Sequence, residues 1–477
     1  MHRINLTFAD AEGTVSENIY GQFIEHLGDC INGGIYDGQN LLSDEKGIRL
    51  DVLEKVKKLS PPILRFPGGT VMHIYHWEDA IGPMSERKQK KNLIWGGVLS
   101  PAFGTAEFIE YCRRIGAEPM ICVNMASGTP EEAGNWVDYC NGTGDTYYAN
   151  LRRSHGYEEP FCVKYWCIGN ECNAEPDIGI QDDVKIYIRD AREFIKFMKL
   201  NDPSIETVIV GCSDFDGWNK PVLDALGSMT NYLSFHFYTS ENGMGPYGPF
   251  AGERHYLNMV KKLDELLDTY PEKPESFNKW YRFPPRQDRI RLMIDEWNLW
   301  QYKNDGIYGL HQIYNGRDMV WIASMLNHFI SDPHIAGCNM AQLCNIIAPI
   351  VASKDGCFEQ TIFAPCELYR KTMYGCRMET QISGQYTIDG GAAGEVEAVS
   401  ASAVKHNGKI CAAVVNRNLE EDTELTLPFD AACVICHAEP DAVNSPEHNA
   451  VEVVSIRFSR DEPIRLPVCS FVIACEI

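Results

Sequence analysis

Residues 119–142 read PMICVNMASGTPEEAGNWVDYCNG, and this stretch contains one complete strand-and-helix unit. The apolar run Pro119–Asn124 predicts a strand that is buried on both faces. Residues 129–132 (Thr-Pro-Glu-Glu) then supply an N-cap, a proline at the first helical position and a glutamate at the third, which predicts a capping box. Asn141-Gly142 marks the end of the helix.

The alternation of a buried strand with a helix recurs along the first three quarters of the chain. A second clear helix is predicted from about Asp182 to Leu200. Eight segments have the strand pattern: Tyr20–Glu25, Ile63–Phe66, Pro119–Asn124, Cys162–Ile168, Thr207–Gly211, Tyr232–Phe237, Ile290–Glu296 and Ile335–Ala341. Eight such units favour an α/β fold of the (β/α)₈ TIM barrel type, although the pattern alone also allows a doubly wound sheet.

The pattern changes after about Thr372, where long helical segments stop. Short apolar runs over 410–416, 423–427 and 471–477 alternate with Gly, Asn and Pro, which predicts a C-terminal antiparallel β-sandwich. The expected organisation is an N-terminal strand over residues 1–14 that joins the sandwich, a barrel over 15–371 and the sandwich over 372–477.

Composition and charge exclude several classes of protein. The chain has 477 residues, 44% of them hydrophobic and 23% charged, as in globular proteins. A net charge of −23 argues against nucleic acid and anionic membranes as partners, because both require a basic surface. No stretch reaches the length of a membrane span, and Asp10 and Glu12 interrupt the N-terminal region, so no signal peptide is expected. We therefore expect a cytoplasmic protein whose 18 cysteines are reduced.

Two of the predicted strands end in a carboxylate, at Glu171 and Glu296. They are the fourth and seventh strands of the count, and the carboxyl ends of barrel strands form the active-site face. Two facing carboxylates are the minimum apparatus for glycoside hydrolysis, one as the proton donor and the other as the nucleophile. The alternative is that each is an ordinary surface residue at a strand end; the neighbouring Trp and Asn side chains favour a sugar site instead.

The chain resembles the retaining (β/α)₈ glycosidases and, more narrowly, the α-L-arabinofuranosidases of glycoside hydrolase family 51. The matching motifs, in chain order, are 19–26 (IYGQFIEH), 33–37 (GGIYD), 64–69 (LRFPGG), 76–79 (HWED), 104–108 (GTAEF), 135–141 (NWVDYCN), 166–171 (WCIGNE), 295–298 (DEWN) and 341–349 (AQLCNIIAP). The family fold is a (β/α)₈ barrel with a β-sandwich, which agrees with the pattern of strands and helices.

The resemblance implies roles for particular residues. Glu171 is expected to be the acid/base and Glu296 the nucleophile, with carboxyl groups about 5 to 5.5 Å apart. The residues expected to bind the substrate are Glu25, Thr70, Asn170, His236, Tyr238 and Gln342. Tyr238 is expected to contact the nucleophile; the plainer alternatives are a core histidine at 236 and simple barrel packing at 238. Neither a metal nor an organic cofactor is implied.

Two positions depart from the family pattern. Family members usually carry Asn after Pro-Gly-Gly, where this chain has Thr70, and one hydroxyl cannot repeat both contacts of an amide. The family's Gly-Pro-Trp-Gln run after Asn-Glu is replaced by Cys-Asn-Ala-Glu-Pro-Asp over 172–177, so a tryptophan that would wall the sugar pocket is missing. The preferred glycone is therefore hypothesised to differ from plain α-L-arabinofuranose.

The resemblance implies an exo-acting arabinofuranosidase that removes terminal arabinofuranosyl residues from oligosaccharides, in L-arabinose metabolism. It also implies a homo-oligomer, since family members often form hexamers. Three alternatives remain: another furanosidase, an endo-acting glucanase or xylanase of the same family, and a carbohydrate-binding barrel without activity.

Overall fold

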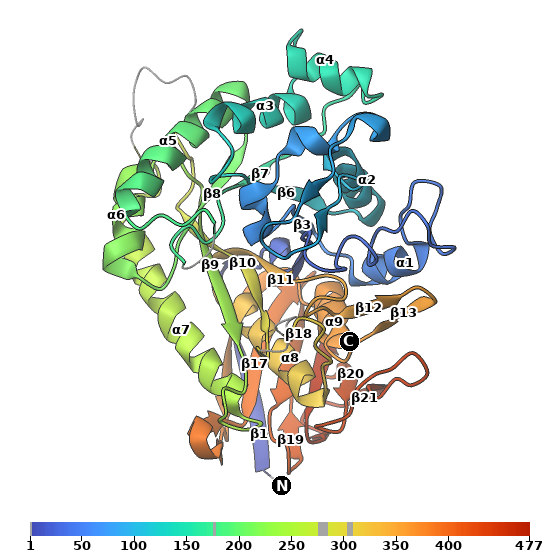
Figure 1. The fold of residues 1–477 in the computed structure, drawn as a ribbon. Coiled ribbons are helices and arrows are strands. Elements are labelled where there is room, and N and C mark those ends of the chain that lie inside the picture. The colour runs from blue at the N-terminus through green and yellow to red at the C-terminus, as the bar shows by residue number, and fades with distance from the viewer. Residues whose placement is uncertain (1, 175–177, 275–284, 303–308) are drawn as a thin grey trace.

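The structure is a computed structural model that describes residues 2–174, 178–274, 285–302 and 309–477. Its elements form two parts, a closed barrel and a large sheet that packs beside it (Figure 1). Among the described residues, no helix combines the length and apolar character needed to cross a bilayer.

Eight parallel strands close into a barrel in the order β10-β11-β2-β3-β6-β7-β8-β9. Their bounds are β2 Gly21–Phe23, β3 Ile63–Phe66, β6 Glu118–Val123, β7 Tyr165–Ile168, β8 Glu206–Ile209, β9 Tyr232–Thr239, β10 Arg291–Leu299 and β11 Ile335–Ala341. Each falls on one of the eight predicted segments. The parallel pairing of β9 with β10 closes the ring, so the barrel is confirmed and the doubly wound sheet is excluded.

Nine α-helices are found among the described residues: α1 Leu50–Leu59, α2 Thr105–Ile115, α3 Pro130–Asn141, α4 Tyr147–Ser154, α5 Val184–Asn201, α6 Lys220–Leu226, α7 Gly248–Leu267, α8 Gly316–Ser331 and α9 Phe363–Thr372. Thr129 caps α3 by accepting a hydrogen bond from the Glu132 N–H at 3.1 Å. The predicted capping box is only half formed, because the Glu132 carboxylate turns away to the His76 ring.

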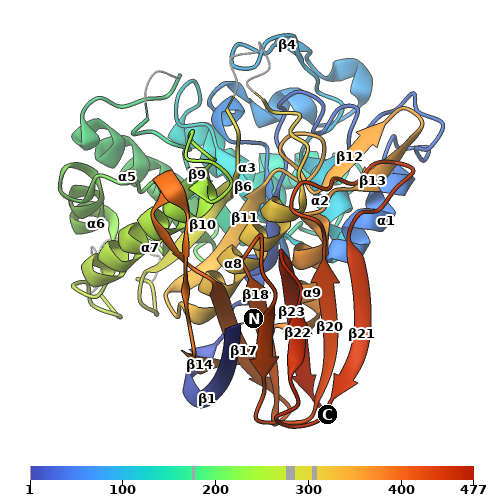
Figure 2. The same cartoon turned by 90° about the horizontal axis from the view of Figure 1, so that it is seen from below.

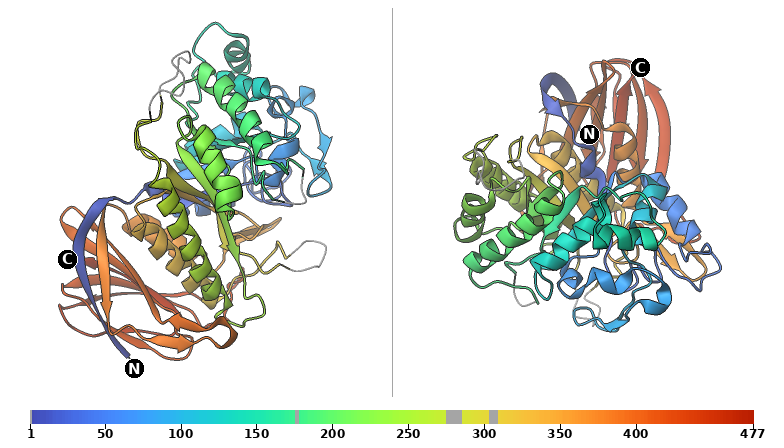
Figure 3. Two further views of the ribbon diagram at one scale, coloured as in Figure 1. Left: turned by 90° about the vertical axis from the view of Figure 1, so that its left-hand side faces the viewer. Right: turned by 90° about the horizontal axis from the view of Figure 1, so that it is seen from above.

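The second part is one continuous sheet of nine strands, in the order β21-β20-β23-β18-β17-β14-β1-β19-β22 (Figure 2). Its strands are β1 His2–Thr14, β14 Cys376–Ser383, β17 Val399–His406, β18 Lys409–Asn416, β19 Thr423–Thr426, β20 Ala431–His437, β21 Glu452–Phe458, β22 Ile464–Leu466 and β23 Ser470–Glu476. The sheet folds around its own apolar core, in which residues from β1, β20 and β22 meet. It is antiparallel except where β1 pairs with β19, and the N-terminal strand lies among the C-terminal ones (Figure 3).

Three short hairpins complete the strands of the described residues. They are β4 Lys90–Lys91 with β5 Val98–Leu99, β12 Ile350–Ser353 with β13 Gly356–Glu359, and β15 Thr387–Asp389 with β16 Glu395–Glu397. The first hairpin follows β3 and brings Trp95 to the site described below.

The barrel and the sheet share one hydrophobic core, in which α8 packs against β17 and β18. A buried ionic group fixes their contact. Arg417, just after β18, donates to the Glu253 carboxylate on α7 at 2.6 Å, and His328 on α8 lies 2.7 Å from the same oxygen. Charges this deeply buried are tolerated only when they are paired, so the group stabilises one relative placement of the two parts.

One expectation about the cysteines was wrong. Cys411 on β18 and Cys475 on β23 form a disulfide, whereas all 18 thiols were expected to be reduced. The two residues are direct cross-strand partners in the antiparallel register, with Cα atoms 4.1 Å apart. This register comes from the tertiary fold and has no signal in the sequence. The other sixteen cysteines, all within the described part of the chain, are free.

His26, next to the candidate site in the sequence, makes the stability of the fold sensitive to acid. The ring is 4% exposed and stacks on Tyr75 with centroids 5.6 Å apart. Burial lowers the pKa of His26 from 6.5 to about 4, against a smaller opposing effect of the Phe103 backbone. Below pH 6.5 the unfolded chain takes up a proton that the folded chain refuses, so stability is lost as the pH falls from 6.5 to 4.

The free energy of unfolding should fall between pH 7 and pH 4, and we expect this fall to be about 3 kcal/mol smaller in His26→Leu than in the wild type. Urea unfolding of the wild type and the variant at pH 7 and pH 4 measures the difference. His448→Leu, at an exposed histidine, is the control and should keep the wild-type dependence. Parallel pH dependences for the wild type and His26→Leu would contradict this role of His26.

Candidate active site

The two candidate carboxylates stand at the carboxyl ends of their strands, on one face of the barrel. Glu296 lies within β10, and Glu171 follows β7 after a sharp turn. Gly169 makes this turn with a φ of +90°, and a Cβ there would lie 2.7 Å from the Cys172 sulfur. Glycine at this position therefore lets the chain leave the strand and present Glu171 to the barrel mouth.

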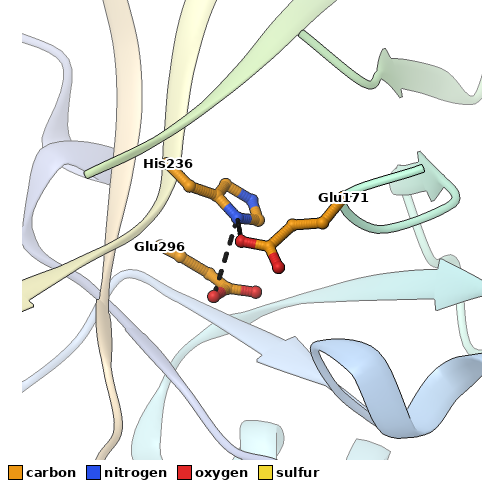
Figure 4. Close-up of side chains that lie close together, drawn as sticks. All are labelled: Glu171, His236 and Glu296. Atoms are coloured by element: carbon orange, nitrogen blue, oxygen red, sulfur yellow. Dashed lines mark hydrogen bonds and ion pairs between the residues drawn. The ribbon is translucent and has the colours of Figure 1, made fainter. Parts of the chain in front are cut away.

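The imidazole of His236, on β9, faces both carboxylates (Figure 4). Its Nδ1 atom lies 2.8 Å from Glu171 Oε1 and 3.6 Å from Glu296 Oε2. One oxygen of each glutamate and this nitrogen all lie within 4.8 Å of one another. A short separation of the two carboxylates is the arrangement that retaining glycosidases use, whereas inverting ones need room for a water molecule.

The Glu296 carboxylate is fixed through both of its oxygens. Arg65 Nη1 donates to Oε1 at 2.7 Å, and the Tyr238 hydroxyl donates to Oε2 at 2.9 Å. Arg65 is fully buried, and its Nη2 donates to the Asn170 side chain at 2.7 Å. Glu296 itself is 6% exposed. A carboxylate held through both oxygens by a guanidinium and a phenol keeps one orientation, as a nucleophile requires.

Asp295, the residue before Glu296, contacts both His236 and Arg65. One of its oxygens lies 3.5 Å from His236 Nε2, and the other lies 3.4 Å from Arg65 Nε. The Ser234 hydroxyl donates a hydrogen bond to the same carboxylate. Burial raises the pKa of Asp295, but the charges of Arg65 and His236 outweigh burial and bring it to about 2. Asp295 is therefore a permanent negative charge that orients the imidazole.

His236 and Glu171 share one proton. Burial lowers the pKa of His236, but the charges of Glu296 and Asp295 raise it well above 6.5. Desolvation raises the pKa of Glu171, yet the hydrogen bond and charge of His236, with the charge of Arg65, bring it below 4.5. In the free site the proton therefore lies on His236, 2.8 Å from the carboxylate that is expected to use it, and the two groups titrate as a pair.

Glu25 follows β2, at the carboxyl end of that strand. Its Oε1 accepts hydrogen bonds from the Val71 N–H and the Trp95 indole, both at 3.0 Å, and its Oε2 accepts one from Gln342 at 2.9 Å. Burial, followed by the charge of Glu296, raises the pKa of Glu25 to about 7. A Cβ on Gly69 would lie 2.6 Å from Glu25 Oε2, which explains the Pro-Gly-Gly turn.

Five of the eight predicted site residues are joined directly or through Arg65, and two more contact each other. The five are Asn170, Glu171, His236, Tyr238 and Glu296, and the pair is Glu25 and Gln342. The eighth, Thr70, is buried beside Val71, whose N–H binds Glu25. Four residues that the sequence analysis did not single out also belong to the site: Arg65, Trp95, Ser234 and Asp295. An arginine inside the buried strand Ile63–Phe66 was a usable signal, whereas nothing in the sequence indicates Trp95.

The sequence matches two family models. They are the α-L-arabinofuranosidase 1 domain over residues 55–258 and the α-L-arabinofuranosidase C-terminal domain over 295–465. It is 38% identical over 385 residues to α-L-arabinofuranosidase C of Emericella nidulans, covering 77% of this chain and 74% of that protein. The chain belongs to the α-L-arabinofuranosidase family. It is thus a glycoside hydrolase by descent, with the fold and the paired carboxylates of that class.

Two further members of the arabinofuranosidase family extend the comparison. One is the intracellular exo-α-(1→5)-L-arabinofuranosidase of Halalkalibacterium halodurans, 35% identical over 78% of this chain and 75% of that protein. The other is the solved structure of the thermostable GH51 α-L-arabinofuranosidase from Thermotoga petrophila, with 33% identity and a TM-score of 0.87. That comparison covers both chains completely, so the barrel and the sheet occur together in the arabinofuranosidase family.

Proposed function

We propose that this chain is a retaining exo-α-L-arabinofuranosidase that removes terminal arabinofuranosyl residues from oligosaccharides by double displacement. The observation that carries the proposal is the arrangement of Glu171 and Glu296. One oxygen of Glu171 lies within 4.8 Å of one oxygen of Glu296, and His236 faces both carboxylates. Retaining glycosidases hold their carboxyl groups about 5 to 5.5 Å apart, whereas inverting enzymes need about 6.5 to 9.5 Å.

The surroundings of the two carboxylates assign their roles in this proposal. Glu296 is the nucleophile, because Arg65 and Tyr238 bind its two oxygens and hold the carboxylate in one orientation. Glu171 is the acid/base, because its side chain is 37% exposed and can reach a leaving oxygen and then a water molecule. The roles cannot be exchanged easily, since both oxygens of Glu296 are already engaged by Arg65 and Tyr238.

The reaction then proceeds in two steps. Glu296 attacks the anomeric carbon while Glu171 delivers a proton to the departing oxygen, which forms a covalent arabinosyl-enzyme. The proton reaches Glu171 from His236 Nδ1 across 2.8 Å, and Asp295 keeps the imidazole in place throughout. In the second step Glu171 takes a proton from water, and the water oxygen displaces Glu296 with net retention. The proton then returns from Glu171 to His236, which restores the free site. Neither step requires a metal or an organic cofactor.

The sugar-binding side is proposed to be formed by Glu25 and its neighbours. Glu25, Asn170 and Gln342 present carboxylate and amide groups that match the hydroxyls of a furanose ring. With a pKa of about 7, Glu25 can donate as well as accept a hydrogen bond near neutral pH. Trp95 lies beside Glu25, to which its indole donates a hydrogen bond.

The setting of the enzyme is part of the proposal. We infer a cytoplasmic homo-oligomer that acts on arabinofuranose-containing oligosaccharides in L-arabinose metabolism, without nucleic acid or membrane partners. The Halalkalibacterium halodurans relative is described as intracellular and exo-acting on α-(1→5) linkages, which supports the location and the exo mode. The charge of −23 is consistent with a small neutral substrate as the partner.

Release of nitrophenol from a panel of aryl furanosides and pyranosides tests the proposal, together with the products formed from linear α-(1→5)-arabino-oligosaccharides. We expect turnover of the α-L-arabinofuranoside and release of single arabinose units from the oligosaccharides. Internal cleavage of a glucan or xylan would favour an endo-acting enzyme of the same family. Sugar binding without turnover of any substrate would indicate an inactive barrel and contradict the proposal.

Thr70 is proposed to limit activity on plain α-L-arabinofuranosides. We expect Thr70→Asn to raise kcat/KM for 4-nitrophenyl α-L-arabinofuranoside by about 5- to 10-fold relative to other furanosides, the value of one added hydrogen bond. Thr70→Ser keeps a single hydroxyl and should behave like the wild type. Full wild-type activity on the arabinofuranoside, with no change in Thr70→Asn, would contradict this role.

A further inference from the structure

Three buried side chains hold the turn that presents Glu171. The turn begins where β7 ends, and each of the backbone carbonyl oxygens of residues 168–170 accepts a hydrogen bond from another element of the barrel. Tyr187 on α5 donates to the first at 3.0 Å, Cys122 on β6 to the second at 3.2 Å, and His73 to the third at 2.8 Å. His73 therefore holds the carbonyl that lies directly before the proposed acid/base.

The contact between His73 and Asn170 fixes the peptide group next to Glu171. His73 Nε2 lies 2.8 Å from the Asn170 carbonyl oxygen, and because a carbonyl can only accept, Nε2 carries the proton. Both residues are 2% exposed, so without this donor the carbonyl would be buried and unsatisfied, which favours rotation of the following peptide group. The Asn170 side chain is bound to Arg65, so such a rotation would move Glu171 instead.

The ring of His73 is itself held in one place. His73 lies in the short 3₁₀-helix η2 Thr70–Ile74, and its carbonyl oxygen accepts a hydrogen bond from the Ser127 hydroxyl at 2.8 Å. The chain that follows Glu171 passes over the ring, because a Cβ at Gly179 would lie 2.3 Å from Nδ1. The ring therefore lies between the chain segments on either side of Glu171, and glycine at 179 leaves the space for it.

The direction of the Glu171 side chain depends on this turn. Glu171 has a φ of +44°, a conformation that residues other than glycine adopt only when surrounding contacts hold them in it. From this backbone its side chain extends to His236, with Oε1 2.8 Å from Nδ1 (Figure 4). We propose that His73 is a positioning residue for proton transfer, because its bond to the Asn170 carbonyl keeps the Glu171 carboxyl within reach of His236 and of the leaving oxygen. This inference rests on the proposed function.

Two substrates with the same glycone separate this role from a general disturbance of the site. In α-(1→5)-arabinobiose the leaving group is a sugar that needs the proton of Glu171, whereas nitrophenolate departs with little protonation. η2 also carries Val71, which binds Glu25, so a variant that only disturbs η2 should lower kcat/KM for both substrates alike. The quantity to measure is therefore the ratio of kcat/KM for arabinobiose to kcat/KM for 4-nitrophenyl α-L-arabinofuranoside.

His73→Leu removes the donor and keeps an apolar side chain in its place. We expect it to lower the ratio by at least about tenfold, since general acid catalysis contributes about 10² to 10⁴-fold and a displaced acid loses part of this. His73→Gln places an amide N–H near the position of Nε2 and should keep the ratio within about threefold of the wild type. His155→Leu is the matched control, because it removes a different ring contact, to the Tyr139 hydroxyl at 3.0 Å, and should keep the wild-type ratio.

An unchanged ratio in a folded His73→Leu protein would overturn the proposal. His73→Asn covers the case in which that variant fails to fold, because its side chain is polar but its amide ends short of the position of Nε2. It should lower the ratio as His73→Leu does, and equal ratios in His73→Asn and His73→Gln would overturn the proposal. Absence of turnover of the nitrophenyl substrate by the wild type is a different result, which would overturn the proposed function itself.

Discussion

Glu296→Gln is expected to lower kcat on α-L-arabinofuranosides by about 10⁴-fold or more, because it removes the atom that forms the covalent bond. The amide is nearly isosteric, and its oxygen can still accept a hydrogen bond from Arg65 or Tyr238. Substrate binding should therefore change little while the chemical step is lost. Steady-state kinetics with 4-nitrophenyl α-L-arabinofuranoside, alongside the melting temperature, measures both.

Chemical rescue makes this prediction specific to the nucleophile. In Glu296→Gly, azide can enter the vacated space and attack the anomeric carbon directly, so the product should be an arabinofuranosyl azide of inverted configuration. Glu25→Gly is a control in which a carboxylate is removed from the same pocket but no rescue is expected. An azide product of retained configuration from Glu296→Gly would contradict the assignment of the nucleophile.

Glu171→Gln is expected to lower kcat/KM by about 10² to 10⁴-fold on substrates with a sugar leaving group, the usual contribution of general acid catalysis. The loss should be smaller for 4-nitrophenyl substrates, because nitrophenolate departs with little protonation. The pH profile should also change. Activity needs the proton of the His236–Glu171 pair, so the wild type loses kcat/KM as the pH rises through the pKa of that pair. The variant should lack this basic limb.

Two measurements decide the role of Glu171. The first compares kcat/KM for arabinobiose and for the nitrophenyl substrate in the wild type and Glu171→Gln. The second is azide rescue of Glu171→Ala, which should give an arabinofuranosyl azide of retained configuration, since azide attacks the covalent intermediate. Equal losses on both substrates, or a basic limb that persists in Glu171→Gln, would contradict the acid/base assignment.

Much of the barrel could be predicted because its strands are buried on both faces and stand out as apolar runs. Ile63–Phe66 and Ile335–Ala341 were predicted with the bounds that the structure has. The ends of strands were predicted less accurately where polar active-site residues belong to the strand. β9 and β10 continue to Thr239 and Leu299, beyond the predicted ends at 237 and 296, because the barrel's neighbouring strands, not local composition, satisfy their backbone groups.

The site was predictable where a residue ends a strand and was missed where its role depends on a neighbour. Glu171 and Glu296 were visible because each follows an apolar run and so had to lie at the barrel mouth. Asp295 sits one residue before Glu296, yet its role depends on His236, Ser234 and Arg65 from other strands. Trp95 and the Cys411–Cys475 disulfide likewise depend on tertiary contacts that no local pattern records.

The most direct test of the account is to trap the covalent intermediate. A 2-deoxy-2-fluoro-α-L-arabinofuranosyl donor with a dinitrophenyl leaving group should react once and then hydrolyse slowly, because fluorine destabilises the cationic transition state of both steps. Mass spectrometry of the digested protein should find one fluorosugar, attached to Glu296 through an ester. An adduct on Glu171 or elsewhere, or turnover of the natural substrate with inversion at the anomeric carbon, would contradict double displacement through Glu296.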